Sequence, residues 1–339
     1  MLGIGNSLMT SGPMPFSQPN DISNLIGWFD FGDVSTLFQG AGGNLNTAVS
    51  STGDKIHTVL NKSTLPTKIC EFMATSAINT YDAITGSGPE WNDDGYLVSD
   101  GGDDCVLMAQ SRPSDVQFGG VSNGVLSNAL IDAQGFALFM VIDPDAAIPD
   151  TDEKFFNLHG SNAESSGGTS ENETIAFTHD KSGEDVDFIF LYQDESTSGD
   201  DMFGSDSNIS SSKQVLSVVT GTGTNASNIY QNGTSIGSGT VDGDNVVALD
   251  LNDGSGVKDD CFSIVGGVSA AGVVTVGSAF TGNLYEVLIY NKELTSSEIE
   301  TIHNHLIDFG LQIEWVSPSR SYSNELIDDD QNEKQGTLF

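Results

Sequence analysis

The stretch Asn283–Leu311, NLYEVLIYNKELTSSEIETIHNHLIDFGL, predicts a strand that is followed directly by one short helix. Thr295-Ser296-Ser297-Glu298 begins the helix as a capping box. In such a box the threonine hydroxyl accepts from the N–H of the glutamate, and the carboxylate accepts from the N–H of the threonine. The question is why a chain that otherwise looks β-rich should close with a well-capped helix.

The predicted helix carries a single apolar stripe. Ile299, Ile302 and Leu306 recur at helical spacing, which places them on one face. Gly310 stands where a left-handed C-terminal cap is expected, and Leu311 is placed for the apolar contact that accompanies such a cap. We therefore expect the helix to lie against the sheet that contains the preceding strand.

The rest of the body has the pattern of a β-protein. The 339 residues include 39 glycines and only 9 prolines, which favours many short strands joined by turns. Residues 135–145 are almost continuously apolar, as in a strand buried on both faces. Asn232-Gly233 predicts a two-residue hairpin, and Asp100-Gly101-Gly102-Asp103 predicts a second hairpin turn. Strand patterns occur within residues 24–31, 94–109, 135–145, 154–161, 173–180, 186–194, 213–221, 227–237, 260–267 and 282–290.

The chain divides into an arm, a single body and a tail. Residues 1–21 form an N-terminal arm rich in Gly, Ser, Pro and Asn, which we expect to become ordered only against a partner. Isolated apolar side chains on extended backbone suit strand addition or insertion into a groove. The candidate anchoring residues are Leu2, Ile4, Leu8 and Met9. Residues 22–313 form the body, and residues 314–339 form an acidic polar tail.

The net charge restricts the class of partner. Eleven Lys and Arg residues against 48 Asp and Glu residues give a formal charge of −37. Such a surface repels phosphate backbones and anionic lipids, so we expect neither nucleic acid nor a membrane as a partner. Basic protein patches and divalent cations are favourable partners. A salty medium that screens dense like charge is the interpretation we favour, because the acidic residues are scattered over the loops.

The cysteines and the N-terminus favour a reducing compartment. Cys70, Cys105 and Cys261 are odd in number and widely spaced, so neither a disulfide framework nor a zinc site is indicated. The first 21 residues have no basic segment followed by an apolar run, and no later stretch could span a bilayer. We therefore expect the protein to be made in a cytoplasm and kept or assembled there.

Both ends of the body resemble one known family. The C-terminal stretch is similar to the closing signature of LamG-like, concanavalin A-type domains, and "ISNLIGWFDFGDVSTLF" is similar to their opening strand and turn. "VLNKS" resembles a family turn, except that Leu60 and Asn61 replace the usual Trp and Asp. The C-terminal matching positions are Gly282, Glu286, Tyr290, Asn291, Leu294 and Glu298. The resemblance implies an all-β fold, a two-sheet antiparallel β-sandwich of the jelly-roll type, closed by one short C-terminal helix.

The same resemblance suggests a function. Similar domains in tailed-bacteriophage proteins often follow a short Gly/Ser-rich arm and sit on the virion surface. This implies a non-enzymatic virion structural protein, assembled in the host cytoplasm, that decorates the capsid or belongs to the tail or a fibre. Its arm would contact other virion proteins, and the protein would be a homo-oligomer or present in many copies. The alternative is a lectin-like module that binds host glycans or polysaccharide.

Catalytic residues are not indicated by the sequence. The β-glucanases of the same superfamily use two glutamates one strand apart, close to E-x-D-x-x-E, because hydrolysis with retention needs paired carboxylates. Glu184-Asp185-Val186-Asp187 and Asp194-Glu195 lack that spacing. We therefore expect no enzyme activity by this route.

Metal and glycan sites are weighed against ordinary packing. Asp250, Asn252, Asp253 and Asp259 supply oxygen ligands of the kind Ca²⁺ prefers, although ordinary surface turns are the interpretation we favour for this loop. His303 and His305, two positions apart on a helix, point in different directions and are not expected to form a metal pair. Trp91 and Tyr96 are the candidate glycan contacts, and packing is the favoured interpretation of Trp91.

Overall fold

The computed structural model describes residues 18–40, 45–65, 68–71, 88–101, 106–108, 135–145, 153–159, 174–182, 185–193, 201–205, 211–220, 227–239, 261–268, 274–275 and 280–307. All structural statements below concern these residues.

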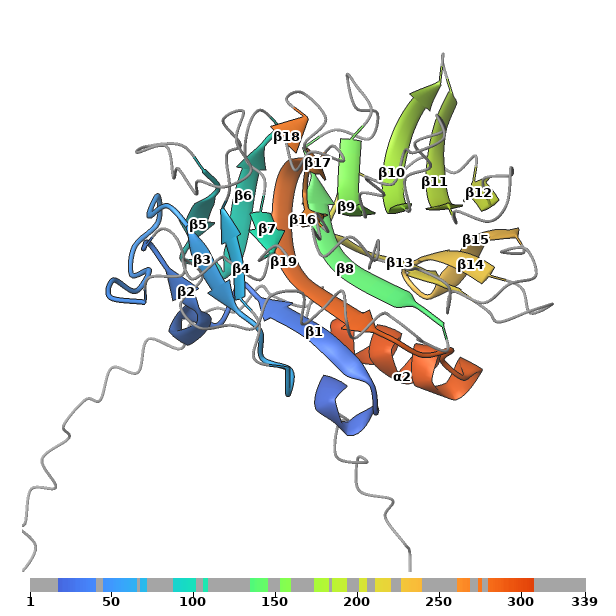
Figure 1. Ribbon diagram of the computed structural model, residues 1–339, viewed down its shortest axis with the longest axis horizontal. Coiled ribbons are helices and arrows are strands. Elements are labelled where there is room, and N and C mark those ends of the chain that lie inside the picture. Colours follow the sequence, from blue (N-terminus) through green and yellow to red (C-terminus); the bar gives the residue numbers. More distant parts are fainter. Residues whose placement is uncertain are drawn as a thin grey trace, which may run out of the picture.

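Two antiparallel sheets make up the body (Figure 1). Sheet A runs in the order β15-β14-β13-β8-β19-β6-β5, and β1 also pairs with β19. Its strands are β1 (Leu25–Asp30), β5 (Glu90–Asn92), β6 (Tyr96–Asp100), β8 (Ala137–Pro144), β13 (Gln214–Val219), β14 (Ser227–Gln231), β15 (Thr234–Gly239) and β19 (Thr281–Tyr290). This arrangement confirms the predicted all-β sandwich.

Sheet B lies across from sheet A, with the order β12-β11-β10-β9-β16-β7-β4-β3-β2. Its strands are β2 (Leu37–Phe38), β3 (Thr58–Leu60), β4 (Lys68–Glu71), β7 (Val106–Met108), β9 (Glu153–His159), β10 (Thr174–Ser182), β11 (Asp185–Gln193), β12 (Asp201–Ser205) and β16 (Cys261–Ile264). A small ribbon, β17 (Gly267–Val268) with β18 (Val274–Thr275), forms a third sheet of two strands, and β17 lies next to β9 and β16 of sheet B. The helical elements are η1 (Pro19–Asp21), η2 (Val34–Thr36) and α2 (Ser296–Leu306).

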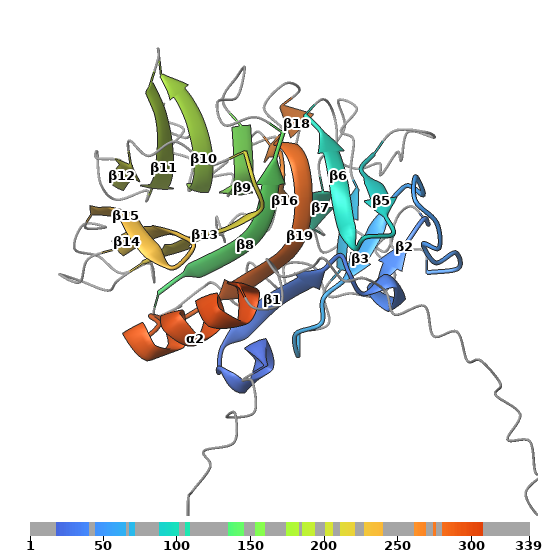
Figure 2. The same ribbon diagram turned by 180° about the vertical axis from the view of Figure 1, so that it is seen from behind.

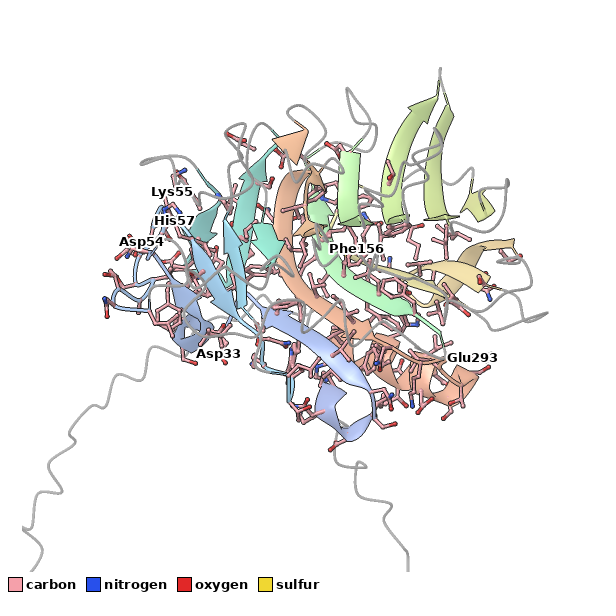
Figure 3. All side chains as sticks on the ribbon, in the orientation of Figure 1. Asp33, Asp54, Lys55, His57, Phe156 and Glu293 are labelled. Carbon is pink, nitrogen blue, oxygen red and sulfur yellow. The ribbon has the colours of Figure 1, made fainter. Side chains whose placement is uncertain are left out.

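The main core lies between the two sheets. Alternate residues of β8 point into it, among them Leu138, Met140 and Ile142, which are at most 1% exposed. They meet aromatic side chains of sheet B such as Phe155 and Phe156, and Figure 3 labels Phe156 in this interior. Period-two alternation explains the pattern of β8, since every second side chain of a strand points to the same face. In β9 the register with β10 shifts at Phe155, which lets the consecutive Phe155 and Phe156 both lie in the core.

A second core covers the outer face of sheet A. The remaining residues of β8, including Phe139 and Val141, point away from sheet B and are also fully buried. They pack with Ile302 and Leu306 of α2 and with Ile22, which follows η1. Both views show α2 beside β1 and the adjoining ends of β8 and β19 (Figures 1 and 2). Sheet A is therefore the middle of three layers, which explains why β8 is apolar on both faces. The position of the helix against this sheet is confirmed as predicted.

The helix begins as predicted. Thr295 Oγ1 accepts from the N–H of Glu298 at 3.3 Å, and the N–H of Thr295 donates to Glu298 Oε2 at 2.9 Å. Lys292 also pairs with Glu298 through Nζ and Oε1, which ties the last strand to the first turn of the helix. The predicted cap residue Gly310 lies outside the described residues.

One hairpin prediction is confirmed and one is wrong. Asn232 and Gly233 have φ of +50° and +79° and join β14 to β15, as the sequence indicated. The two strands within residues 94–109 do not pair with each other: β6 belongs to sheet A and β7 to sheet B. The chain therefore passes from one sheet to the other between β6 and β7. Local alternation is satisfied by either arrangement, so it could not distinguish them.

Gly282 occupies a position in β19 that a side chain could not share. Its φ is +144°, and an added Cβ would overlap the carbonyl oxygen of Asp143 on the neighbouring strand β8. Gly53 offers a matched comparison, because it also has a positive φ, +89°, but no atom lies within 4 Å of an added Cβ. A substitution at Gly53 would therefore introduce backbone strain alone, whereas the same substitution at Gly282 would introduce backbone strain and steric overlap.

We predict that Gly53→Ala lowers the free energy of unfolding by about 1–2 kcal/mol, the strain of a left-handed alanine. Gly282→Ala should lower it by about 3 kcal/mol or more, since β8 and β19 must also separate locally. Urea titration followed by tryptophan fluorescence measures both changes. Equal losses in the two variants would show that β8 and β19 do not approach each other this closely.

Candidate functional site

Five of the residues that carry the resemblance meet where β1, β19 and the 61–63 segment come together, and we call them the signature network: Trp28, Asp30, Asn61, Lys62 and Glu286. Trp28 Nε1 donates to Glu286 Oε1 at 2.7 Å, joining the first and last strands of the body. Lys62 Nζ lies 2.8 Å from Asp30 Oδ2 and 4.6 Å from the centroid of the Trp28 ring. An ion pair and a cation–π contact thus hold one ammonium in place.

Asn61, at a position where the domains that this chain resembles usually have Asp, makes two hydrogen bonds to β1. Its Oδ1 accepts from the N–H of Trp28 at 2.8 Å, and its Nδ2 donates to the carbonyl of Ile26 at 2.8 Å. An ionised aspartate could accept the first hydrogen bond but could not donate the second. The amide therefore fastens the 61–63 segment to two backbone groups of β1.

Glu286 is the most perturbed carboxyl of the network. Burial raises its pKa to about 7, and the charge of Asp30 acts in the same direction. The Trp28 N–H and the ammonium groups of Lys62 and Lys213 oppose that rise. A carboxyl with a pKa near neutrality can be a catalytic acid, but here Glu286 is engaged by Trp28.

A second group of polar side chains lies on the outer face of sheet A, which we call the tyrosine patch: Tyr96, Asp143, Lys213, Asn283 and Tyr285. The Tyr96 and Tyr285 ring centroids are 5.1 Å apart, and Lys213 Nζ lies 3.5 Å from the Tyr285 centroid. Asn283 hydrogen-bonds Asp143. Their sequence neighbours, such as Leu97 and Leu284, point into the main core, so the patch faces outward.

Burial dominates the ionisation of the tyrosine patch. It lowers the pKa of Lys213 to about 8, against the opposing charges of Asp143 and Glu286. It raises the pKa of Asp143, partly offset by the Asn283 hydrogen bond and by Lys213. The patch therefore offers two aromatic rings, an amide, a carboxylate and an ammonium on one sheet face.

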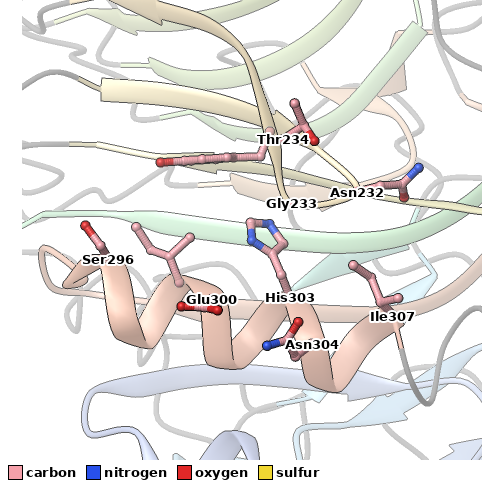
Figure 4. A pocket seen from close by; sticks show the side chains of 10 residues that line it. Asn232, Gly233, Thr234, Ser296, Glu300, His303, Asn304 and Ile307 are labelled. Carbon is pink, nitrogen blue, oxygen red and sulfur yellow. The ribbon is translucent and has the colours of Figure 1, made fainter.

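A groove of about 450 Å³ lies between helix α2 and the turn of the β14–β15 hairpin (Figure 4). This volume falls in the range of small-molecule sites, about 300–1,000 Å³. We call it the helix–hairpin groove. Its lining residues are Tyr230, Asn232, Gly233, Thr234, Ser296, Ile299, Glu300, His303, Asn304 and Ile307.

His303 lies at the base of this groove and is 3% exposed. Its Nε2 is 2.9 Å from Ser217 Oγ, and its ring packs between Phe139 and Tyr230, with centroids 5.2 and 5.3 Å away. Burial lowers the pKa of His303 to about 4, so the ring is neutral at pH 7. His303 is thus a structural part of the groove that adds no charge.

The sequence-predicted glycan contacts fare differently. Trp91 is 6% exposed, and its Nε1 donates to the carbonyl of Phe31 at 3.0 Å. Stacking on a sugar needs an accessible ring face, so the prediction that Trp91 contacts a glycan is wrong and the packing interpretation holds. Tyr96 is partly exposed and belongs to the tyrosine patch.

The remaining candidate residues lie outside the described residues, so their predictions stay open. These are the calcium ligands Asp250, Asn252, Asp253 and Asp259 and the anchoring residues Leu2, Ile4, Leu8 and Met9. Within the described ranges, no group of three or more His, Cys, Asp or Glu side chains is arranged to hold a metal ion. No helix in those ranges is long and apolar enough to span a membrane.

Sequence reasoning missed the helix–hairpin groove and most of the tyrosine patch. Tyr230 and Asn304 face the same groove although 74 residues separate them along the chain. Lys213, which directly precedes β13, meets Tyr285 of β19. No local motif marks such a convergence. The only sequence signal was indirect, namely that the hairpin and the amphipathic helix were both predicted.

Comparisons with known proteins give only remote likenesses. The chain matches no protein-family profile and no curated protein. A Trypanosoma rangeli sialidase in complex with sialic acid is 14% identical, with a TM-score of 0.43 over 83% of this chain and 33% of the sialidase. The NanB sialidase of Streptococcus pneumoniae is 16% identical, with a TM-score of 0.39 over 52% of this chain and 25% of NanB.

A smaller protein gives a similar result. The CBM40 module of a Ruminococcus gnavus sialidase, bound to α2,3-sialyllactose, is 9% identical, with a TM-score of 0.41 over 61% of this chain and 96% of the module. The chain spans only a quarter to a third of the two sialidases above. These likenesses are too remote to assign an activity.

We predict that Glu286→Gln weakens the pH dependence of stability. Because the pKa of Glu286 is raised from 4.5 to about 7, its contribution is complete below pH 4.5 and is lost as the pH rises through 7. Glutamine keeps an acceptor for Trp28 and does not ionise. The difference in unfolding free energy between pH 5 and pH 8 should shrink by about 2–3 kcal/mol.

Glu298→Gln is the matched control, measured by the same urea titrations. Burial raises the pKa of Glu298, but hydrogen bonds from Lys292 and Thr295 outweigh burial and lower it. Its contribution is therefore present at high pH and lost as the pH falls, and the variant should be less stable at pH 8. An unchanged pH profile in Glu286→Gln would contradict the burial of that carboxyl.

Proposed function

We propose that this chain is a non-enzymatic structural protein of a phage virion, displayed on the particle surface as a capsid decoration or a tail or fibre component. The observation that carries the proposal is the signature network. The residues that carry the resemblance to virion-associated LamG-like domains contact one another and join the first and last strands of the body. The 2.7 Å hydrogen bond between Trp28 and Glu286 is an example. These residues build a scaffold and are not presented to a substrate.

The two carboxylates that pair with Lys62, Asp30 of the network and the neighbouring Asp33, support a non-catalytic role. Asp30 is held by Lys62 at 2.8 Å and accepts from the N–H of Gly32 at 2.9 Å. Asp33 lies 3.0 Å from the same ammonium and accepts from the hydroxyl of Ser35 at 2.6 Å. A hydrolytic pair would need one carboxylate to face the substrate as a nucleophile or base, whereas these two are committed to neighbouring protein groups.

The start of the body supports anchoring through the arm. The Tyr290 hydroxyl donates to the carbonyl of Pro19 at 3.2 Å, and Lys292 Nζ donates to Ser23 Oγ at 3.2 Å. The arm therefore joins the body at a point fixed to the last strand, on the same outer face of sheet A as α2. A virion protein that holds the arm would therefore be positioned near this end of the last strand.

The charge of the chain suits a component present in many copies. A net charge of −37 on each copy keeps neighbouring bodies apart and soluble while the arm supplies adhesion. It also favours basic patches on other virion proteins as the anchoring partner.

We predict that deletion of residues 1–17 leaves the body folded but prevents its incorporation into particles. The deletion keeps Pro19 and its contact with Tyr290, so thermal unfolding should be unchanged. Incorporation is measured by complementing phage that lack the protein and probing purified particles by immunoblot. Normal incorporation of the truncated chain would show that the arm is not the anchor.

A second candidate function is glycan adhesion through the tyrosine patch. The specific observation in its favour is that Tyr96 is partly exposed beside Tyr285, with Asp143 and Asn283 available as hydrogen-bonding groups. Of the two predicted glycan contacts, Trp91 is buried and Tyr96 is accessible to a ligand.

We predict that Tyr96→Ala abolishes or weakens, by about 10-fold or more, any binding seen on a glycan array, because an aromatic stacking face is lost. Val34→Ala is the control, since Val34 is 41% exposed and lies outside the patch. Binding that survives in Tyr96→Ala would place glycan recognition elsewhere on the protein.

A further inference from the structure

The helix–hairpin groove is built by two elements that are held in a fixed relation. Asn232 in the hairpin turn accepts from the N–H of Val215 at 2.9 Å, and its own N–H donates to the carbonyl of Val215 at 2.8 Å. The turn is thereby fastened to β13. On the other side, Ile302 and Leu306 fix α2 to sheet A. The groove is consequently formed before any ligand arrives.

The hairpin turn lies against the helix at ordinary van der Waals distance. A Cβ added at Gly233 would lie 3.8 Å from Cβ of His303, so the backbone of the turn faces the side of the histidine ring. Tyr230 contributes the flat wall next to His303, with ring centroids 5.3 Å apart, and Ile299 and Ile307 add apolar surface. One side of the groove therefore suits the apolar faces of a ring-shaped ligand.

Four exposed polar side chains complete the lining: Thr234 from the hairpin and Ser296, Glu300 and Asn304 from the helix. Within the described part of the chain, none of these four side chains makes a hydrogen bond or ion pair. Two hydroxyls and an amide can both donate and accept, and a carboxylate accepts. A ligand with many hydroxyl groups satisfies such a mixture, because each hydroxyl also donates and accepts.

Charge decides between classes of such ligands. Glu300 is the only acidic side chain in the lining, the lining contains neither Lys nor Arg, and His303 is neutral at pH 7. The chain as a whole carries −37. An anionic sugar would meet repulsion without a counter-charge, and its carboxylate would lose hydration that the groove does not replace.

We propose that the helix–hairpin groove binds an uncharged sugar of one or two pyranose rings, with Tyr230 as the stacking face and Thr234, Glu300 and Asn304 as hydrogen-bonding groups. This site is separate from the tyrosine patch, and it does not depend on the particle-surface role. The groove discriminates against sialic acid and other acidic sugars.

Isothermal titration calorimetry on the full chain tests the proposal. The probes are lactose and 3′-sialyllactose, which differ by one acidic residue, together with maltotriose, cellotriose and mannotriose. At least one of the neutral oligosaccharides should bind. If lactose binds, 3′-sialyllactose should bind about 10-fold more weakly or worse, corresponding to about 1.4 kcal/mol.

Asn304→Trp fills the groove from an exposed helix position and should lower the affinity for the bound neutral sugar by about 10-fold or more. Ser297→Trp is the matched control, since Ser297 is exposed on the same helix but does not line the groove. Equal affinities in the two variants would overturn the proposal. It would also be overturned if no neutral oligosaccharide binds, or if 3′-sialyllactose binds as tightly as lactose.

These outcomes are distinguishable from a failure of the proposed virion role. Deletion of residues 1–17 tests anchoring and leaves the groove intact, whereas Asn304→Trp alters the groove and leaves the arm intact. Loss of sugar binding in Tyr96→Ala but not in Asn304→Trp would assign recognition to the tyrosine patch and overturn the groove.

Discussion

The structure depends on the need to bury sheet A on both faces. β8 carries fully buried residues on each side, with Leu138 and Met140 toward sheet B and Phe139 and Val141 toward α2. Fully burying one such side chain contributes about 1.5–3 kcal/mol, which an uncovered sheet face would forfeit. A chain that ended after β19 would leave this second face in water. The capped helix is therefore required by the composition of the strand it covers.

The helix covers only part of that face. The rest of the face carries polar side chains that are paired with one another by hydrogen bonds and ion pairs. Next to the helix-covered area, Trp28 and Glu286 hydrogen-bond across the sheet, while Lys62 lies over the Trp28 ring and pairs with Asp30. Half-buried charges are tolerated there because each has a partner. Further along the sheet the tyrosine patch follows, and at the other border of the helix lies the helix–hairpin groove. The two candidate binding surfaces therefore lie on either side of the area that helix α2 covers.

Sequence reasoning succeeded where the determining contacts are local. The capping box of Thr295 and Glu298, the apolar stripe through Ile302 and the Asn232-Gly233 turn all involve residues within a few positions of one another. It failed for the segment 94–109, because alternation does not tell which sheet a strand joins. The burial of Trp91 agrees with the packing that was favoured for it, but its turn-rich surroundings gave no sign that the indole would reach the carbonyl of Phe31.

The family resemblance predicts the fold better than the function, because the residues that carry it make the contacts that join the first and last strands of the body. Trp28 and Glu286 are 258 positions apart and in direct contact, and Tyr290 reaches back 271 positions to Pro19. Residues with such long-range structural roles can be shared by proteins whose activities differ. The side chains that could distinguish this protein, such as Tyr96 and Asn304, lie outside the signature, on positions whose change would leave the sandwich closed. We therefore expect the function of this chain to depend on side chains at the two edges of the helix-covered area, such as Tyr96 and Asn304, and not on the residues that carry the resemblance.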